Sequence, residues 1–303
     1  MELLTGYKLI SNSNNRKMKI KEALMQASYN ISKKWKDTPL LDAQVILQKT
    51  TGMTKEKLIA SYNCDLHEDI LDNFNLMVEK RVSGFPVAYI TGEKEFFGRS
   101  FYVNENTLIP RRDTETIVET VLEESKKIIK EIEPLPIKIL DLCTGSGCIA
   151  ITLKSELGEK ANVEASDISA ETQKNFYKNC ENILGKKLPF YISDLFTSIT
   201  NRYHIIVSNP PYLKNTHVDE MVSNNWPEPE ISLRGGNDGL DFIRKITEAA
   251  GKHLEEGGVL CIEAEPSQMD IIQELLKNNN FGYILIKKDM AQRERVIRAE
   301  WKK

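Results

Sequence analysis

The segment IKILDLCTGSG, residues 137–147, decides the fold because it joins a strand pattern to a glycine-rich turn. Its first six residues are mostly apolar, as in a strand that is covered on both faces. Gly145 and Gly147 follow, and an apolar helical pattern begins at Ile149. Glycine lets a ligand approach the backbone closely, and the free N–H groups at a helix start favour an anionic group. The segment therefore predicts an α/β sheet that binds a ligand at the carboxyl end of this strand.

Strand and helix patterns alternate after this segment. Further strand patterns are NVEAS, PFYIS, HIIVS, GVLCIEA, FGYILIKK and ERVIRAEW, and helix patterns separate most of them. This alternation predicts a mostly parallel sheet with helices on both faces. No helix pattern separates the last two strands, so we expect them to pair as an antiparallel edge. The sequence thus predicts an α/β, Rossmann-like sheet of seven strands.

The amino-terminal part of the chain has helical patterns without strands. Ile20, Leu24 and Ile31 share one helical face, and Gly84 closes the last of these helices. The next stretch, PVAYITGEKEFFGRSFYVNENTLIP, is rich in β-branched and aromatic residues, which favours a β-hairpin. We predict a helical domain over residues 1–85 with residues 1–17 poorly ordered, a β-hairpin linker over 86–112, and the sheet domain over 113–303. A helix over residues 114–132 would open the sheet domain.

The composition excludes several classes of protein. A net charge of -3 argues against affinity that comes mainly from nucleic-acid phosphates. The five cysteines form no C-x-x-C pair and the four histidines have no metal-ligand spacing, so we expect reduced thiols and no metal site. No apolar run approaches the ~20 residues that a membrane helix needs, and the first residues do not have the pattern of a signal peptide. We therefore expect a cytoplasmic protein.

Asp167 ends the next predicted strand, about 20 residues beyond the glycine turn. A carboxylate in this place can accept hydrogen bonds from both ribose hydroxyls of a nucleotide. The alternative is an ordinary helix-capping aspartate. Position and spacing together favour ribose binding. NAD would satisfy the same two features, because the final alanine of GSGCIA is tolerated in its fingerprint.

The sequence NPPY, residues 209–212, follows the strand HIIVS and so lies beside the glycine turn. Two prolines fix φ and remove two donors, which leaves the backbone carbonyls near Asn209 and Pro210 free. Asn209 adds a side-chain acceptor, and Tyr212 adds a flat aromatic wall. This set fits a planar N–H₂ group, whose lone pair it can orient toward a methyl donor. A plain Asn-Pro turn is the alternative, but NPPY at this place favours a methyl donor.

The chain resembles the HemK/PrmC family, the glutamine N5-methyltransferases that modify peptide-chain release factors. The resemblance covers almost the whole chain, in PVAYITGEKEFFG, TLIPRRDTE, ILDLCTGSGCIAI, SDLF, VSNPPY, EPEISLRGGNDGL, GGVLCIEAEPSQ and RERVIRAEW. NPPY and the glycine loop are shared with other amino-methyltransferases, whereas PVAYITG–EFFG and EP–LRGG–DGL are more particular to this family. The resemblance implies a class I methyltransferase fold, S-adenosyl-L-methionine as cofactor, and the glutamine of a release factor's Gly-Gly-Gln motif as substrate.

The resemblance also implies roles for single residues. The residues that would hold the cofactor's methionine part are Cys143, Thr144, Gly145, Ser146 and Gly147. Asp167 would hold its ribose, and Asp194 with the backbone of Leu195 would hold its adenine. The residues that would grip the glutamine amide are Asn209, Pro210, Pro211 and Tyr212, of which Asn209 would also touch the cofactor and Asn209, Pro210 and Tyr212 would be catalytic.

The resemblance defines the roles of three further residues less closely. Phe96 or Phe97 would pack near the reacting groups, with Phe97 counted among the substrate contacts. Arg111 would lie near the cofactor carboxylate or at the domain junction.

Two positions depart from the family pattern. Cys143 stands where the family usually has Gly; a positive φ would strain a cysteine there, and we expect instead that the position tolerates a small side chain. Arg112 replaces a common Pro in a surface loop. We interpret Cys143 and Cys148 as two small residues that flank the loop and not as a redox switch.

Other functions share parts of this pattern. A methyltransferase for a nucleic-acid base would use the same NPPY chemistry, and a related enzyme could modify a glutamine of a ribosomal protein. A non-catalytic cofactor-binding module is the alternative from another class, and the intact NPPY argues against it. The acidic tract 218–230 is long for a loop, so we expect it to cover the substrate; a solvated insertion is the alternative.

Overall fold

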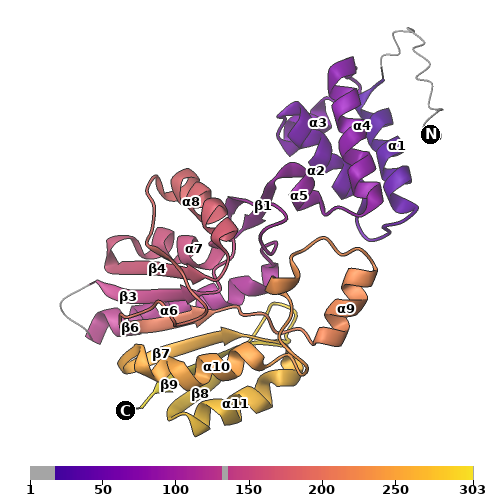
Figure 1. Ribbon diagram of the computed structural model, residues 1–303. Coiled ribbons are helices and arrows are strands. Elements are labelled where there is room, and N and C mark those ends of the chain that lie inside the picture. The colour runs from indigo at the N-terminus through magenta and orange to yellow at the C-terminus, as the bar shows by residue number, and fades with distance from the viewer. Residues whose placement is uncertain (1–17, 132–135, 303) are drawn as a thin grey trace, which may run out of the picture. The chain divides into compact units, whose positions relative to one another are not determined.

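Seven strands form one mixed sheet in the computed structural model, which describes residues 18–131 and 136–302 (Figure 1). Their order across the sheet is β5-β4-β3-β6-β7-β9-β8. The strands are β3 (Ile137–Leu142), β4 (Ala161–Asp167), β5 (Phe190–Ile192), β6 (Tyr203–Ser208), β7 (Leu254–Glu263), β8 (Phe281–Lys288) and β9 (Glu294–Trp301). The predicted α/β sheet is confirmed, and β9 pairs antiparallel with both β7 and β8, as expected for the last two strands.

The register of the central strands brings three loops to one level of the sheet. β3 lies between β4 and β6 and runs parallel to both. Leu142, the last residue of β3, pairs with Ser166 of β4 and with Ser208 of β6. Parallel strands that end in register release their loops side by side. The glycine turn, Asp167 and the segment 209–212 therefore emerge at the same edge.

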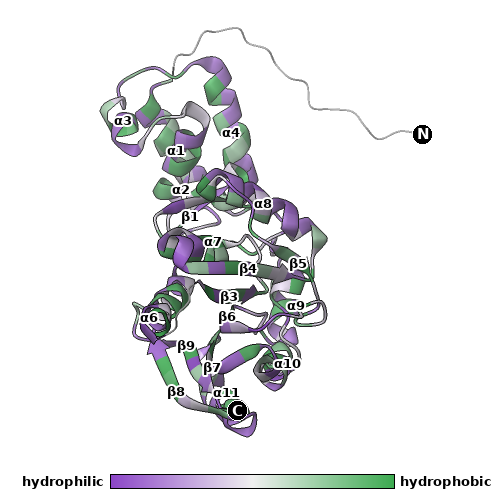
Figure 2. Cartoon of the chain, turned by 90° about the vertical axis from the view of Figure 1, so that its left-hand side faces the viewer, coloured by the Kyte–Doolittle hydropathy of each residue, from purple (hydrophilic) through white to green (hydrophobic). Residues whose placement is uncertain are grey.

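Helices cover both faces of the sheet. The helices of this unit are α6 (Glu115–Glu131), α7 (Cys148–Leu157), α8 (Ala170–Leu184), α9 (Asn215–Ser223), α10 (Asp241–Ala249) and α11 (Met269–Asn278). Ile137 and Ile139 of β3 pack into a cluster with α6, α7 and α8, whereas Leu140 and Leu142 pack into a second cluster with α10 and α11. Figure 2 shows hydrophobic and hydrophilic residues together on α6, as expected for a helix with one face on a sheet.

The amino-terminal residues form a separate helical unit, and contacts divide the chain after Thr91. Its helices are α1 (Ile20–Ser32), α2 (Pro39–Thr51), α3 (Lys55–Ala60), α4 (Glu68–Ser83) and α5 (Val87–Thr91). The predicted face of α1 is confirmed, because Ile20, Leu24 and Ile31 are buried. An ion pair between Arg81 and Asp42 joins α4 to α2, with 2.7 Å between Nε and Oδ2.

The region predicted as a β-hairpin linker contains a helix as well. α5 occupies the VAYIT segment, although its residues favour strands. Helical spacing brings Val87 and Ile90 against the apolar cluster of the first unit, and this packing overrides the local preference. The hairpin follows as β1 (Glu93–Phe96) and β2 (Arg99–Tyr102). It belongs to the second unit, because Phe96 and Phe101 enter the cluster under α6 and α7. The three-part division with its predicted boundaries stays a prediction.

The tract after NPPY is partly helical and not the irregular loop that we expected. α9 covers Asn215–Ser223, and its Val218 is buried. Val218 and Val222 have the i, i+4 spacing of one helical face, a short signal that the acidic residues around it obscure. The predicted disorder of residues 1–17 lies outside the described residues, as does Ile132. Among the residues that the structure describes, no helix is long and apolar enough to cross a membrane.

The central strands make a stability test possible. Ile206 of β6 is fully buried in the cluster under α10 and α11, whereas Leu285 on β8 is 51% exposed. We expect Ile206→Ala to lower the free energy of unfolding by about 2–5 kcal/mol and Leu285→Ala by about 0.5 kcal/mol or less. Urea denaturation in a Trp35→Phe background measures this, since Trp226 and Trp301 then report the sheet unit. Equal losses in the two variants would contradict the described register.

Candidate active site

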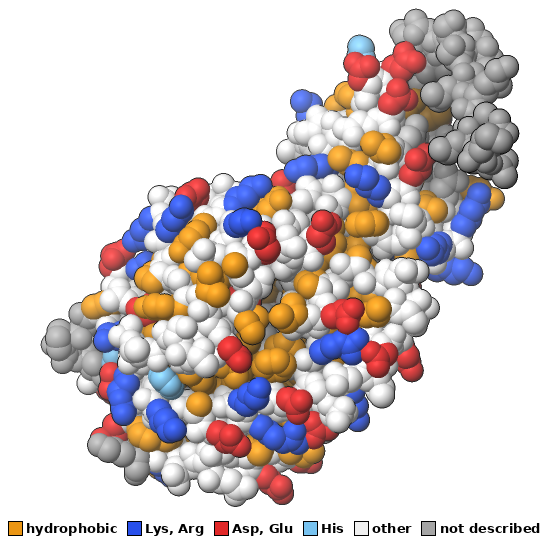
Figure 3. Space-filling model, viewed as in Figure 1, with side chains coloured by type: hydrophobic (Ala, Val, Ile, Leu, Met, Phe, Trp, Pro, Cys, Tyr) orange, Lys and Arg blue, Asp and Glu red, His pale blue; other side chains and the backbone are white. Residues whose placement is uncertain are grey.

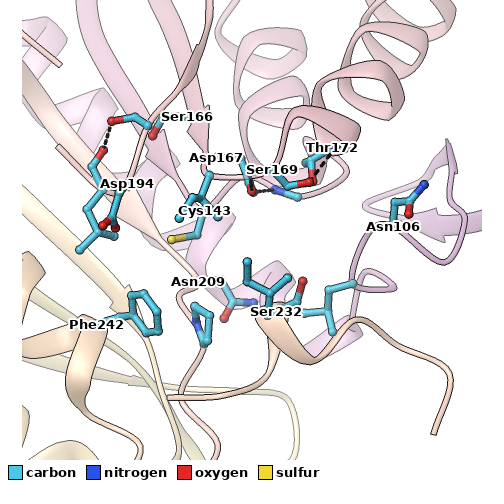
Figure 4. Close-up of a pocket in the computed structure, with 17 residues that line it drawn as sticks. Asn106, Cys143, Ser166, Asp167, Ser169, Thr172, Asp194, Asn209, Ser232 and Phe242 are labelled. Atoms are coloured by element: carbon cyan, nitrogen blue, oxygen red, sulfur yellow. Dashed lines mark hydrogen bonds between the residues drawn. The ribbon is translucent and has the colours of Figure 1, made fainter. Parts of the chain in front are cut away.

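The carboxyl ends of β3, β4 and β6 border a cavity of about 170 Å³. Figure 4 shows Cys143, Asp167 and Asp194 along one side of it, with Asn209, Ser232 and Phe242 across from them. Exposed apolar side chains lie at its border, among them Ile168 and Ile231. Figure 3 shows hydrophobic side chains gathered around a hollow on this face of the second unit. The cavity thus combines carboxylates with apolar walls, which suits a nucleotide-like ligand.

The glycine turn is held from below by a buried carboxylate. Asp141 accepts hydrogen bonds from the Thr144 hydroxyl, at 2.6 Å, and from the Ala150 N–H, at 3.1 Å. It is fully buried, and burial raises the pKa of its carboxyl group to about 7. The Thr144 N–H donates to the Ser166 carbonyl at 3.0 Å, which ties the turn to β4. The sequence pattern alone does not indicate this role for Asp141.

The two glycines of the turn serve different purposes. Gly147 has φ +82°, and a Cβ built there would lie 2.5 Å from the Phe176 ring, so only glycine fits under α8. Gly145 has φ +54°, but no atom lies within 4 Å of its Cβ position. It borders the cavity, and its N–H points to Asp167. Gly147 is therefore required for packing, and Gly145 leaves open space on the ligand side.

Asp167 faces the cavity at the end of β4. Its two oxygens accept from the Gly145 N–H at 2.9 Å and from the Ser169 N–H at 3.1 Å. Burial raises the pKa of its carboxyl group. Ser169, and not Asp167, caps α8, because the Ser169 hydroxyl accepts from the Thr172 N–H. Each carboxylate oxygen retains further acceptor capacity toward the cavity, so the geometry supports the predicted ribose contact over the helix-cap alternative.

Cys143 adopts a left-handed backbone with φ +59°. Our expectation that this position simply tolerates a small side chain was incomplete, because the turn does require a positive φ that is unfavourable for cysteine. The side chain borders the cavity, and burial raises the pKa of its thiol well above the usual range. Burial has the same effect on the pKa of the Cys148 thiol. Neither thiol has the lowered pKa of a reactive cysteine.

The SDLF turn supplies the next wall of the cavity. The Ser193 N–H donates to the Asp167 carbonyl at 2.9 Å, and the Ser193 hydroxyl donates to the Leu195 carbonyl at 2.8 Å. These bonds hold Leu195 at φ +48°. Asp194 and Leu195 both border the cavity, next to Asp167. The structure thus brings together the three residues predicted for the cofactor's ribose and adenine.

NPPY is divided between the cavity and the interior. Asn209 and Pro211 border the cavity, while Pro210 is buried and Tyr212 packs beside the cluster under α10 and α11. The Asn209 N–H₂ group donates to the Thr114 hydroxyl at 3.3 Å. With the N–H₂ end on Thr114, the carbonyl oxygen is the end of the amide left to accept a hydrogen bond from a ligand. The structure does not place Pro210 or Tyr212 on the cavity wall.

The glycine-rich segment 233–240 packs against the backbone of Tyr212, the last residue of NPPY. A Cβ at Gly235 would lie 2.7 Å from the Tyr212 Cα, and one at Gly239 would lie 2.2 Å from the Tyr212 carbonyl oxygen. The Gln268 amide donates to the same carbonyl oxygen at 3.0 Å and to the Gly239 carbonyl at 3.2 Å. The LRGGNDGL segment therefore fixes the Tyr212 backbone through close contact that only glycine allows.

Phe97 and Arg111 both lie outside the main cavity. Phe97 forms the tip of the β1–β2 turn at φ +50°, its N–H donates to Glu115 at 2.9 Å, and its side chain packs on the core. It does not border the cavity. Arg111 borders a smaller neighbouring cavity with Thr144, Gly145 and Ser146, where its guanidinium pairs with Glu228.

Glu228 is a buried anchor that sequence reasoning missed. Its carboxylate accepts from the Ile109 N–H at 3.0 Å and from the Trp226 indole N–H at 3.0 Å, and it pairs with Arg111. These bonds connect residues 226–232, which contribute Ile231 and Ser232 to the cavity, to the irregular segment before η1 (Arg112–Thr114). In the sequence, only the EPE motif (residues 228–230) pointed to Glu228, and that motif does not show whether its side chain is buried.

Comparisons with known proteins agree with this geometry. A family model described as the PrmC N-terminal domain matches residues 22–92, and one described as the methyltransferase small domain matches residues 121–226. A release factor glutamine methyltransferase of Haemophilus influenzae is 33% identical over 298 residues, which cover 94% of this chain and 100% of the relative. One from Flavobacterium psychrophilum is 42% identical over 263 residues, covering 85% of this chain and 90% of the relative. The chain belongs to the release factor glutamine methyltransferase family.

This membership confirms the predicted family and the predicted enzyme class, a methyltransferase that uses S-adenosyl-L-methionine. Among solved structures, the catalytic domain of hMettl16 in complex with the MAT2A 3′UTR hairpin 6 aligns with a TM-score of 0.52 and 15% identity. The alignment covers 78% of this chain and 82% of that chain. It supports the class I methyltransferase fold. The roles of single residues in this family member stay predictions.

The Asp167 carboxylate provides a test of the cofactor site. We expect Asp167→Asn to weaken S-adenosyl-L-methionine binding about tenfold or more, because hydrogen bonds to a charged group contribute about 1.5–3 kcal/mol each. Isothermal titration calorimetry measures the dissociation constant. Glu171→Gln removes a charge from the exposed surface of α8 nearby and serves as the control. Equal affinities of the wild-type protein and Asp167→Asn would exclude the ribose role.

The backbone of Cys143 provides a second test. Glycine adopts φ +59° without steric cost, whereas a β-branched residue is the least suited. We expect Cys143→Gly to keep or raise the free energy of unfolding, by up to about 1 kcal/mol, and Cys143→Val to lower it by more than about 1 kcal/mol. The urea assay described above measures both variants. A stable Cys143→Val protein would mean that the turn relaxes to a negative φ.

Proposed function

We propose that this enzyme transfers a methyl group from S-adenosyl-L-methionine to the side-chain amide nitrogen of the glutamine in the Gly-Gly-Gln motif of peptide-chain release factors. The observation that carries the proposal is the position of Asn209 at the end of β6, across the cavity from Cys143 and Asp167. Relatives that cover nearly the whole chain are named release factor glutamine methyltransferases, which supports the substrate.

The cavity fits the cofactor at three places. The Asp167 carboxylate is available for the ribose hydroxyls, and the walls formed by Asp194 and Leu195 suit the adenine. Open space at the Gly145 Cβ position and the nearby Arg111 guanidinium suit the methionine part with its carboxylate. When bound, the cofactor would supply an electrophilic methyl group on a sulfonium, from which a neutral thioether is an excellent leaving group.

The residues of NPPY would align the substrate nitrogen. An amide nitrogen is a poor nucleophile because its lone pair is delocalised into the carbonyl. The Asn209 oxygen and a proline-flanked backbone carbonyl would accept the two amide hydrogens and stabilise the positive charge that develops on nitrogen. Holding the reacting groups in line can lower the barrier by roughly 7–11 kcal/mol. Methyl transfer needs no general base here, because the proton can leave afterwards.

We further propose that the helical unit contributes to recognition of the protein substrate and that the enzyme acts in the cytoplasm. With five helices in the described residues 18–91, that unit is too small to form a catalytic site of its own. The net charge of -3 favours a protein substrate over a nucleic acid, and we propose no sequence-specific contact with nucleic acid.

A methyl-transfer assay with labelled cofactor tests the proposed substrate. We expect label on a purified release factor, no label on its variant with the Gly-Gly-Gln glutamine changed to alanine, and none on bulk tRNA or DNA. Asn209→Ala should lower the rate by about 100-fold or more, because it removes a positioned acceptor. Asn224→Ala, at an exposed position beyond α9, is the matched control. Label on nucleic acid would keep the cofactor assignment and overturn the substrate.

A further inference from the structure

Glu263 is a buried carboxylate that the proposed mechanism does not use. It is the last residue of β7, and its neighbour Ile262 pairs with Ser208, the residue before Asn209. The side chain is 1% exposed. One oxygen, Oε1, accepts from the Thr114 hydroxyl at 3.2 Å. The other, Oε2, is buried without a hydrogen-bond partner among the described residues.

Thr114 connects this carboxylate to the active site. Its O–H donates to Glu263, and its oxygen accepts from the Asn209 N–H₂ group at 3.3 Å. An ionised carboxylate only accepts hydrogen bonds, and a hydroxyl has one proton to give. The Thr114 proton is therefore committed to Glu263, and only a lone pair of Thr114 remains for Asn209. Asn209 can satisfy that lone pair only with its N–H₂ end.

We propose that ionised Glu263 is a positioning residue that acts through Thr114 to hold the Asn209 amide with its oxygen toward the substrate. This inference rests on the proposed function for its catalytic consequence, but the orientation of Asn209 exists without any substrate. If Glu263 gains a proton, it can donate to Thr114. The Thr114 hydroxyl is then free to donate to the Asn209 oxygen, and the amide can rotate so that its N–H₂ end faces the substrate N–H₂ group. That arrangement has no acceptor for the substrate.

The surroundings of Glu263 bring this change into the physiological range. Burial is the main influence and raises the pKa of Glu263 to about 7. The Thr114 hydrogen bond and Arg295 of β9 lower this pKa, Asp113 of η1 raises it, and the Asn209 amide lowers it. Tyr212 also faces the carboxylate, and its own pKa is raised by burial and by the charge of Glu263. Glu263 is thus ionised above about pH 7 and protonated below it.

The orientation of Asn209 can be followed without substrate. We expect the side-chain ¹⁵N–¹H₂ signals of Asn209, assigned by their loss in Asn209→Ala, to shift with a midpoint near that of Glu263. The shift should vanish in Glu263→Gln, shrink strongly in Thr114→Val and persist in Glu256→Gln. Glu256 is on the same strand with an exposed side chain, so its variant makes the same chemical change away from the site. An Asn209 signal that is constant with pH, or that titrates unchanged in Glu263→Gln, would overturn the inference.

Turnover provides the second readout. At saturating cofactor and release factor, kcat of the wild-type enzyme should rise with pH through the Glu263 transition. Glu263→Gln should lose this rise and have a kcat about tenfold lower above neutral pH, since misalignment of a reacting group has costs of this order or more. Cofactor affinity should change little, which a general loss of structure would not allow. Thr114→Ser should recover most of the activity that Thr114→Val loses.

The two readouts separate this inference from the proposed function. No label on the release factor with the wild-type enzyme would refute the proposed substrate, while the Asn209 titration would still decide the role of Glu263. Label on the release factor with the same pH profile in the wild-type enzyme and Glu263→Gln would refute the positioning role and leave the substrate intact.

Discussion

The in-register pairing of β3 with both β4 and β6 is the constraint on which the rest of the second unit depends. Leu142 lies opposite Ser166 and Ser208, so the residues that follow these three strands meet at one edge of the sheet. A shift of one strand by a single residue would turn its apolar side chains to the wrong face. Packing of both sheet faces therefore also fixes the distance between Asp167 and Asn209, although neither residue belongs to the core.

The site built on this edge violates several local preferences at once. Cys143 and Leu195 have positive φ values. Asp141 and Glu263 are buried and Asp167 is partly buried, and desolvation raises the pKa values of their carboxyl groups. Taken alone, each positive φ value and each buried carboxyl group costs free energy of folding. The surrounding sheet, helices and ties such as the Thr144 and Gly145 N–H bonds hold them in place. Such a concentration of unfavourable features is typical of functional sites.

Most of the fold could be predicted because its signals are local and repeated. Strands β3 to β9 each have an apolar pattern, and glycines or caps separate them from the helices. Prediction failed where tertiary contacts override local preference: Val87 and Ile90 form a helix because its spacing packs both against the apolar cluster of the first unit. In the site, Asp167 and Asn209 could be found from motif position. Glu228 and Glu263 could not, because their importance comes from burial and from partners such as Ile109 and Thr114.

The contact of Gly235 and Gly239 with Tyr212 has a consequence for the order of assembly. The glycine turn, Asp167, Asp194 and Leu195 all lie within residues 137–195, so they are synthesised before Tyr212. The Tyr212 backbone, in contrast, is fixed by Gly239 and by Gln268. The ribosome adds Gln268 56 residues after Tyr212. A nascent chain would thus contain the residues predicted for the ribose and adenine well before those that fix the substrate side. An enzyme that acts on the translation machinery would then become competent only when nearly the whole polypeptide has been made.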